Sequence, residues 1–392
     1  MRRLLQILLL KPVLWLAAKF SSKPDKLRIF TALSRLLKQI KDEPGKRGLI
    51  IPFDLSTGRF IIFSDHHRGA KNGADDFAAA EPNYLAALDY YYTNNFFFIS
   101  LGDSEELWEN NLIKVKKCNA ITFEKEKLFI QQNRFVKIFG NHDLFWDNDP
   151  FAGWQLKNIY GQELKVYEGV VLQSVVNSWE SIVGSREFET RNVDSELRTD
   201  NSQLISPNSS LTIFLTHGHQ GDASSDGNWF SKFFVAKIWA PLQAYLRINP
   251  NTPAYDASLK TKHNQLMYEW SIEQNNLLLI TGHTHQPIFE SFTHLERLYN
   301  RLLDARNRKD ASAIADLENE ISKRKQDYIT ISGDYRHMKP TYFNTGCCCF
   351  SDGDITGIEI ADGCIRLIKW TKKNNQTIKQ VLEEKLLLEI RL

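Results

Sequence analysis

The sequence predicts an α/β fold in which short buried strands alternate with helices. Several runs rich in Phe, Ile, Val and Leu and bounded by Gly are typical of buried strands, and five of them end in Asp, His or Asn. A chain of 392 residues with 42% hydrophobic content can bury a large core, as one domain with insertions or as two. Because open α/β sheets place their sites at strand ends, we also expect a functional site there.

These five segments share one pattern, an apolar run followed by residue types that bind metals. They are RFIIFSDHHRG with Asp65 and His67, NFFFISLGDSEELWE with Asp103, RFVKIFGNHDLF with Asn141, His142 and Asp143, LTIFLTHGHQGD with His217, and LLLITGHTHQPIF with His283 and His285. Any one of them alone could be a polar loop whose histidines bond to backbone. Because Asp, His and Asn are ligands of divalent metals, their repetition at five strand ends predicts a metal site.

The mixture of nitrogen and oxygen ligands indicates which metals to expect. Such a set suits Mn, Fe, Co or Zn better than Mg or Ca. Two divalent ions about 3.5–4 Å apart can hold both the attacking and the leaving oxygen of a displacement at phosphorus, and they lower the pKa of bound water. A carboxylate shared between the ions would supply negative charge to both. We therefore expect two divalent metal ions, Mn, Fe or Zn, as cofactors.

The series D-x-H, G-D-x-x-E, G-N-H-D, H-G-H and G-H-T-H, in this order, resembles the calcineurin-like metallophosphoesterase superfamily. The resemblance covers about residues 59–290 and the strands that follow. It implies a four-layer α-β-β-α sandwich of two mixed sheets with helical insertions, and a metal-dependent phosphoric ester hydrolase. In the implied ligand sets, one metal is held by Asp65, His67, Asp103 and His285, and the other by Asp103, Asn141, His217 and His283.

The resemblance also implies two catalytic residues. His142 would face the substrate phosphate and assist the leaving oxygen, and Asp143 would hold the other ring nitrogen of His142. The alternative for His142 is an ordinary loop histidine. Glu106 is either a partner of the site or an acid at the start of a helix.

Residues 1–45 are predicted to be an N-terminal amphipathic helical segment. Within 24–41, apolar residues at helical spacing form one face, which favours packing on the core. Residues 1–20 begin with basic side chains, and polar residues interrupt their apolar run, leaving too little for a spanning helix. Two alternatives stay open for them: an interfacial helix on a membrane or a helix packed on the protein body.

Residues 46–372 are the predicted metallophosphoesterase domain, with two insertions. The apolar segment 227–257 follows a predicted metal ligand and is expected to act as a lid, with an ordinary buried helix as the alternative. Residues 293–327 have the spacing of a helical hairpin. Strands at 341–346, 355–360 and 364–370 should complete the second sheet, and residues 373–392 are predicted to be a C-terminal tail containing a short charged helix.

The motif GDSEELW, together with the apolar insertion, resembles the UDP-2,3-diacylglucosamine pyrophosphatase-like enzymes, which carry G-D-x-x-E-x-W. This implies an amphiphilic, lipid-linked phosphodiester, pyrophosphate or phosphomonoester as substrate. The chain differs from these enzymes in having His142 where they usually have arginine, and in having residues 293–327. The alternatives are a soluble phosphoprotein phosphatase and a non-catalytic metal-binding scaffold of the same fold.

Charge and cysteine content limit the partners and the compartment. A net charge of +2 gives no overall field for nucleic acid, so we expect a phosphorylated small molecule or lipid as partner. The five cysteines do not have the spacing of a disulfide scaffold, which predicts a cytoplasmic protein, with peripheral contact to the inner face of a membrane as a further option. Cys347 to Cys349 are predicted to form a buried strand, with a metal role as the alternative.

Overall fold

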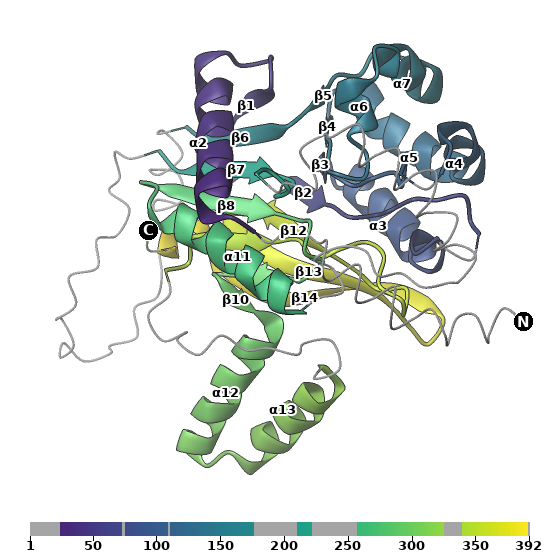
Figure 1. Cartoon of the computed structure of the whole chain (residues 1–392). Helices are drawn as coiled ribbons and strands as arrows, with labels where there is room; N and C mark the ends of the chain where they lie inside the picture. Colours follow the sequence, from purple (N-terminus) through teal and green to yellow (C-terminus); the bar gives the residue numbers. More distant parts are fainter. Residues whose placement is uncertain are drawn as a thin grey trace, which may run out of the picture.

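The computed structural model describes residues 24–72, 75–108, 110–175, 210–221, 257–324 and 339–390. Two mixed sheets of seven strands pack face to face, and helices cover both outer faces (Figure 1). The predicted four-layer α-β-β-α sandwich is therefore confirmed.

The first sheet contains, in spatial order, β1 (Gly48–Phe53), β6 (Gly169–Ser174), β7 (Thr212–Thr216), β8 (Leu277–Thr281), β11 (Tyr342–Asn344), β9 (Ile288–Phe289) and β10 (Phe292–Thr293). The second sheet contains β14 (Gln376–Leu386), β13 (Cys364–Lys373), β12 (Ile355–Ala361), β2 (Phe60–Phe63), β3 (Phe97–Leu101), β4 (Phe135–Ile138) and β5 (Val166–Tyr167). Strands β2, β3 and β4 run parallel to one another, as do β7 and β8. Their carboxyl ends therefore lie at common sheet edges.

Helices α2 (Lys26–Asp42) and α11 (Ala257–Ile272) contact the first sheet, and η1 (Phe77–Ala79), α3 (Glu81–Thr93), α4 (Leu112–Cys118), α5 (Ala120–Gln131), α6 (Phe145–Asn148) and α7 (Ala152–Tyr160) belong to the layer on the second sheet. Figure 1 shows the two groups on opposite sides of the paired sheets. Helix α2 agrees with the amphipathic helix expected over 24–41, and its apolar face is buried, except that Leu27, expected on that face, is exposed.

The strands are apolar on both faces because both faces are covered. In β2, Phe60 and Ile62 join the core between the sheets, whereas Ile61 and Phe63 pack under the helices. In β7, Ile213 and Leu215 face the other sheet, and Phe214 packs against the α2 and α11 layer. Successive side chains of a strand point to opposite faces of the sheet. Because both faces are covered here, every position is apolar, which explains the continuous Phe, Ile and Leu runs of the sequence.

Three expectations for the C-terminal region are wrong. The tail forms no helix over Gln376–Leu386; it is the long edge strand β14, paired antiparallel with β13. Of the three strands expected to complete the second sheet, only β12 and β13 do so, because β11 instead pairs with β8 of the first sheet. Cys347 to Cys349 lie in the loop after β11, where a strand was expected.

The second insertion contains helices α12 (His294–Arg308) and α13 (Ala311–Arg324), which pack on each other and project from the body (Figure 1). A short helix, η3 (Leu387–Glu389), follows β14.

Residues 1–23 and nearly all of the expected lid, 227–257, fall outside the described residues. No helix in the described ranges is long and apolar enough to cross a membrane. The domain boundaries stay predictions.

Candidate metal centre

All seven predicted metal ligands follow strands, and six of them, all but Asn141, come together in groups of nearby ligand atoms. Asp65 and His67 come after β2, Asp103 after β3 and Asn141 after β4, all in the second sheet; His217 follows β7, and His283 and His285 follow β8 of the first sheet. In each of three groups, the candidate ligand atoms lie within 4.8 Å of one another. The groups are Asp65, His67 and His285; His67, Asp103 and His142; and Asp103, His217 and His283.

The first group lies around Asp65. Its Oδ1 is 3.2 Å from Nε2 of His285, and that nitrogen is 3.1 Å from Nε2 of His67. The Asp65 carboxylate also accepts hydrogen bonds from the backbone N–H of His283, at 3.1 Å to Oδ1 and 3.0 Å to Oδ2. These contacts bring the β2 loop of one sheet against the β8 loop of the other.

The second group lies around Asp103. Its Oδ2 is 3.1 Å from Nε2 of His217 and 3.8 Å from Nε2 of His67. His217 donates from Nδ1 to the carbonyl oxygen of Leu101 at 2.9 Å, which leaves Nε2 directed at the carboxylate. Asp103 thus lies between the two groups, the position expected of a ligand that both metals share.

Buried polar atoms without a partner test whether the site fits metal ions. Oδ1 of Asn141 and Nε2 of His283 are buried and have no hydrogen-bond partner. An unpaired buried polar group costs about 1–3 kcal/mol, so two such atoms on loops that carry candidate ligands favour a bound cation. The residues present therefore fit the two divalent ions that the sequence predicts.

The charges of the cluster agree with a cation site. Burial opposes ionisation of His67, but the hydrogen bond with Glu106 and the Asp103 charge outweigh it and raise the pKa of His67 to about 10. Burial is likewise outweighed at His217, where Asp103 and Asp65 raise the pKa to about 9. The carboxylates thus favour positive charge at the positions where metals would bind.

Glycines immediately before the ligands permit the close approach of the loops. A Cβ on Gly140 would lie 2.6 Å from the backbone nitrogen of Asp103 and would contact its carboxylate. A Cβ on Gly102, whose φ is +85°, would lie 2.5 Å from Nδ1 of His217. The Gly of the G-D and G-N-H-D motifs is therefore a packing requirement of the site.

The structure corrects the role expected for Asp143. Its carboxylate accepts hydrogen bonds from the backbone N–H groups of Gly140 at 2.5 Å, Ser104 at 2.9 Å and Asp103 at 3.3 Å, so it fixes the loops after β3 and β4. Burial raises the pKa of Asp143 to about 6. Glu106 instead occupies the position beside the His142 ring.

Glu106 contacts two of the site histidines. Its Oε2 is 2.7 Å from Nδ1 of His142 and 3.0 Å from Nδ1 of His67. Burial opposes its ionisation, but the interactions with His142 and His67 lower the pKa of Glu106 to about 2. Trp108 stacks on the His142 ring, with centroids 4.5 Å apart and an interplanar angle of 20°. The residues that match G-D-x-x-E-x-W therefore orient His142.

Other side chains near the site could not be placed there from the sequence. His263 of α11 lies 5.2 Å from His283, ring centroid to ring centroid, and its Nε2 is 2.7 Å from the carbonyl oxygen of Gly218. Cys349 lies 3.7 Å from Nδ1 of His285, Sγ to nitrogen. No sequence motif surrounds His263. The consecutive cysteines were recognisable in the sequence, but their position beside His285 could not be predicted from it.

Two seven-stranded sheets between helices, with candidate metal ligands at strand ends, define an α/β sandwich with a candidate metal centre. The chain belongs to the calcineurin-like phosphoesterase family, whose model matches residues 58–287, more than half of the chain and a range that contains all seven candidate ligands. No curated protein matches the chain.

Among solved structures, vacuolar protein sorting 29 from Cryptosporidium parvum is similar at 11% identity and a TM-score of 0.29. The match covers 84% of this chain and 98% of that one.

Proposed function

We propose that this protein is a phosphoric ester hydrolase that works with two divalent metal ions. The observation that carries the proposal is the convergence of six candidate ligands from four strand ends, together with the buried atoms without a partner on Asn141, after a fifth strand, and on His283. Membership of the calcineurin-like phosphoesterase family supports the same chemistry.

The geometry suggests how the residues share the ions. Asp65, His67, Asp103 and His285 would hold one ion, and Asp103, Asn141, His217 and His283 the other. Bound there, Mn, Fe or Zn would supply Lewis acidity toward the phosphoryl oxygens and lower the pKa of water. Asp103 would supply negative charge to both positions.

His142 would act on the substrate directly. Its ring is held between the indole of Trp108 and the Glu106 carboxylate, which lies 2.7 Å from Nδ1. Because Nδ1 faces the Glu106 carboxylate, Nε2 is the ring nitrogen left to donate to the phosphoryl or leaving oxygen. Such acid assistance typically contributes about 10²–10⁴-fold to a rate.

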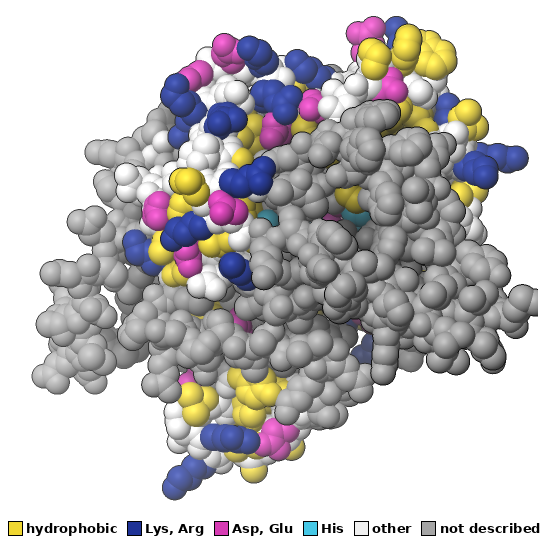
Figure 2. Space-filling model, viewed as in Figure 1, with side chains coloured by type: hydrophobic (Ala, Val, Ile, Leu, Met, Phe, Trp, Pro, Cys, Tyr) yellow, Lys and Arg dark blue, Asp and Glu magenta, His cyan; other side chains and the backbone are white. Residues whose placement is uncertain are grey.

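We also propose an amphiphilic, lipid-linked phosphoester or pyrophosphate as substrate. The support is the sequence pattern around Glu106 and Trp108 and the apolar composition of residues 227–257. Among the described residues visible in Figure 2, basic and acidic side chains are interspersed, and the net charge of +2 argues against nucleic acid as a partner. A cytoplasmic location, with residues 1–20 contacting a membrane surface, belongs to the same proposal.

Hydrolysis by Mn-loaded full-length protein tests these proposals. Bis-p-nitrophenyl phosphate, p-nitrophenyl phosphate, a phosphopeptide and a UDP-linked lipid pyrophosphate should be compared, using His142→Ala and Asp103→Asn, with His294→Ala in α12 as the control. We expect turnover that collapses in the first two variants and is highest with the lipid. Preference for the phosphopeptide would indicate a protein phosphatase. Two bound ions without turnover on any substrate would indicate a scaffold.

A further inference from the structure

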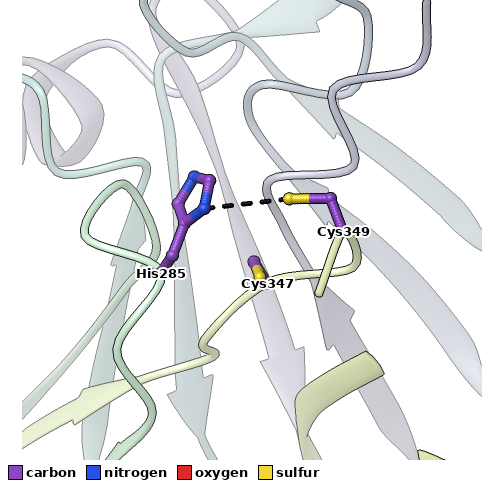
Figure 3. Close-up of side chains that lie close together, drawn as sticks. All are labelled: His285, Cys347 and Cys349. Carbon is purple, nitrogen blue, oxygen red and sulfur yellow. Dashed lines mark hydrogen bonds between the residues drawn. The ribbon is translucent and has the colours of Figure 1, made fainter. Parts of the chain in front are cut away.

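A cluster that shares only His285 with the proposed ligand sets adjoins the candidate metal centre. His285, in the loop after β8, faces Cys347 and Cys349, in the loop after β11, and the ligand atoms of all three lie within 4.8 Å of one another. Figure 3 shows the Cys349 sulfur pointing at the imidazole of His285, with Cys347 on the same loop nearby. The proposed hydrolysis uses neither cysteine.

The distance between Cys349 and His285 fits a shared metal ion. Sγ of Cys349 is 3.7 Å from Nδ1 of His285. With Zn–S of about 2.3 Å and Zn–N of about 2.0 Å, tetrahedral geometry places sulfur and nitrogen roughly 3.5 Å apart. The two atoms thus already have nearly the separation that zinc requires.

The loop that carries the cysteines is held by its own backbone. The N–H of Cys348 donates to the carbonyl oxygen of Asp65 at 3.1 Å, and the N–H of Thr356 donates to the carbonyl oxygen of Cys347 at 3.0 Å. Cys347 is buried and Cys349 is half-buried, so solvent can supply a further ligand. Preorganised donors reduce the ordering cost of binding.

The two nitrogens of His285 face different partners. Nε2 lies 3.2 Å from Oδ1 of Asp65 and 3.1 Å from Nε2 of His67, inside the proposed hydrolytic centre. Nδ1 is turned the other way, toward Cys349. The cysteine side of the ring is therefore chemically distinct from the oxygen-rich side, because thiolates select soft or borderline ions.

We propose that His285, Cys347 and Cys349 form a separate binding site for a thiophilic divalent cation, Zn²⁺ or Cd²⁺, adjoining the hydrolytic centre through His285. Binding displaces the thiol protons and, when Nε2 of His285 holds the hydrolytic ion, the remaining ring proton from Nδ1; water completes the coordination. The site does not depend on turnover, so it holds even if the protein hydrolyses no phosphoester.

Cobalt titration of the reduced, metal-free, full-length protein tests the site. We expect a near-ultraviolet thiolate-to-cobalt charge-transfer band in the wild type. The band should be lost in Cys349→Ser and in Cys347→Ser, and retained in Cys118→Ser, which alters another free, half-buried cysteine. Because Cys347 is buried, circular dichroism should verify the fold of that variant, and Cys349→Ser is the deciding one. Absence of the band in the wild type, or its persistence in Cys349→Ser, would overturn the proposal.

Metal stoichiometry separates this site from the hydrolytic one. Equilibrium dialysis against Cd²⁺ should show one fewer tightly bound ion in Cys349→Ser than in the wild type, whereas Asp103→Asn should keep the charge-transfer band. If Asp103→Asn abolishes turnover and leaves the band, the two sites are distinct. If the wild type lacks turnover but shows the band, only the hydrolase proposal fails. An unchanged Cd²⁺ count in Cys349→Ser would contradict the thiophilic site.

Discussion

Five of the seven proposed ligands have left-handed backbone conformations. The φ angles are 53° at Asp65, 49° at His67, 49° at Asp103, 68° at His283 and 56° at His285. Asp and His tolerate this region better than most residues, but it still costs energy that the surrounding structure must supply. The ligand residues thus determine the turns of their loops as well as the chemistry of the site.

The contact between Glu106 and His142 predicts a graded loss of activity. His142→Ala should lower turnover by about 10²–10⁴-fold because the proton donor is removed. Glu106→Gln should lower it by about 10–100-fold, since orienting partners typically have effects of this size. Steady-state kinetics on bis-p-nitrophenyl phosphate and metal analysis are the measurements, with Glu124→Gln on the α5 surface as the control. Unchanged turnover in Glu106→Gln would show that Glu106 does not orient His142 for catalysis.

The raised pKa values of His67, about 10, and His217, about 9, predict proton release on metal binding. Without metal, both imidazoles are protonated near pH 7, and coordination must displace those protons. Metal affinity should therefore rise with pH. Calorimetric titration with Mn²⁺ in buffers of different ionisation enthalpy measures the released protons. A binding enthalpy independent of the buffer would contradict this expectation.

The same pKa values predict the stability of the metal-free protein. A histidine whose folded-state pKa is raised stabilises the fold below its unfolded value of about 6.5 and loses that contribution as the pH rises through the folded value. The free energy of unfolding of chelator-treated protein should therefore fall from about pH 6.5 to about 10. Urea unfolding across this range is the measurement. A constant or rising free energy would show that these imidazoles are not protonated.

Among the elements, those buried on both faces could be predicted from the sequence and the edge strand could not. Runs such as FIIF of β2 lie between two apolar layers, so their continuous apolar sequence identifies them as strands. Strand β14, QTIKQVLEEKL, lies at a sheet edge and is mostly exposed or half-buried, so its charged residues resemble a helical surface. Pairing with β13 determines its structure, and charged edges of this kind discourage association with other chains.

The strand-end glycines predict a specific loss of metal. Gly140→Ala places a methyl group against Asp103 and should sharply reduce metal content, because the loops after β3 and β4 must separate. Gly153→Ala in α7 is the matched control: its Cβ would meet nothing within 4 Å, and a helical Gly→Ala should stabilise by roughly 0.5–1 kcal/mol. Metal analysis and thermal unfolding check both variants. Full metal content in Gly140→Ala would refute the packing argument.

Across the whole molecule, a buried ion network joins the helical layer to the loops of the site. Arg68 donates to Glu105 and Glu126, both at 2.6 Å, and Lys137 donates to Glu105 at 3.0 Å. Tyr84 of α3 and Tyr160 of α7 donate to Glu126 at 2.9 and 2.8 Å. The network therefore connects the β2 and β3 loops, strand β4 and three helices beneath the ligands.

Breaking this network should destabilise the fold. Arg68→Leu leaves buried carboxylates without their cation, which typically costs about 3–5 kcal/mol. The free energy of unfolding in urea measures the effect. Lys38→Ala, which removes an exposed ion pair with Asp42 on α2, is the control and should change little. A similarly small effect of Arg68→Leu would mean that Lys137 and the tyrosines compensate for the lost charge.

How far the sequence predicts the site depends on the range of the interactions. Ligand residues such as Asp65 and His217 are recognisable because carboxylate and imidazole at the end of an apolar strand have few structural uses. The partner of His142 and the neighbours of His285 depend on how loops from distant segments pack, as the contact with Cys349 shows. The local signal therefore indicates which residues meet, and tertiary packing determines which atoms touch.

His67 and His285 are 218 positions apart in the chain, yet their Nε2 atoms lie 3.1 Å from each other. During synthesis, chains emerge N-terminal end first, so the β2 loop leaves the ribosome long before its partner exists. The Asp65, His67 and His285 group can form only after residue 285 has been translated and the first sheet has paired. Complete loading with metal would consequently mark a late stage of maturation of the nascent protein.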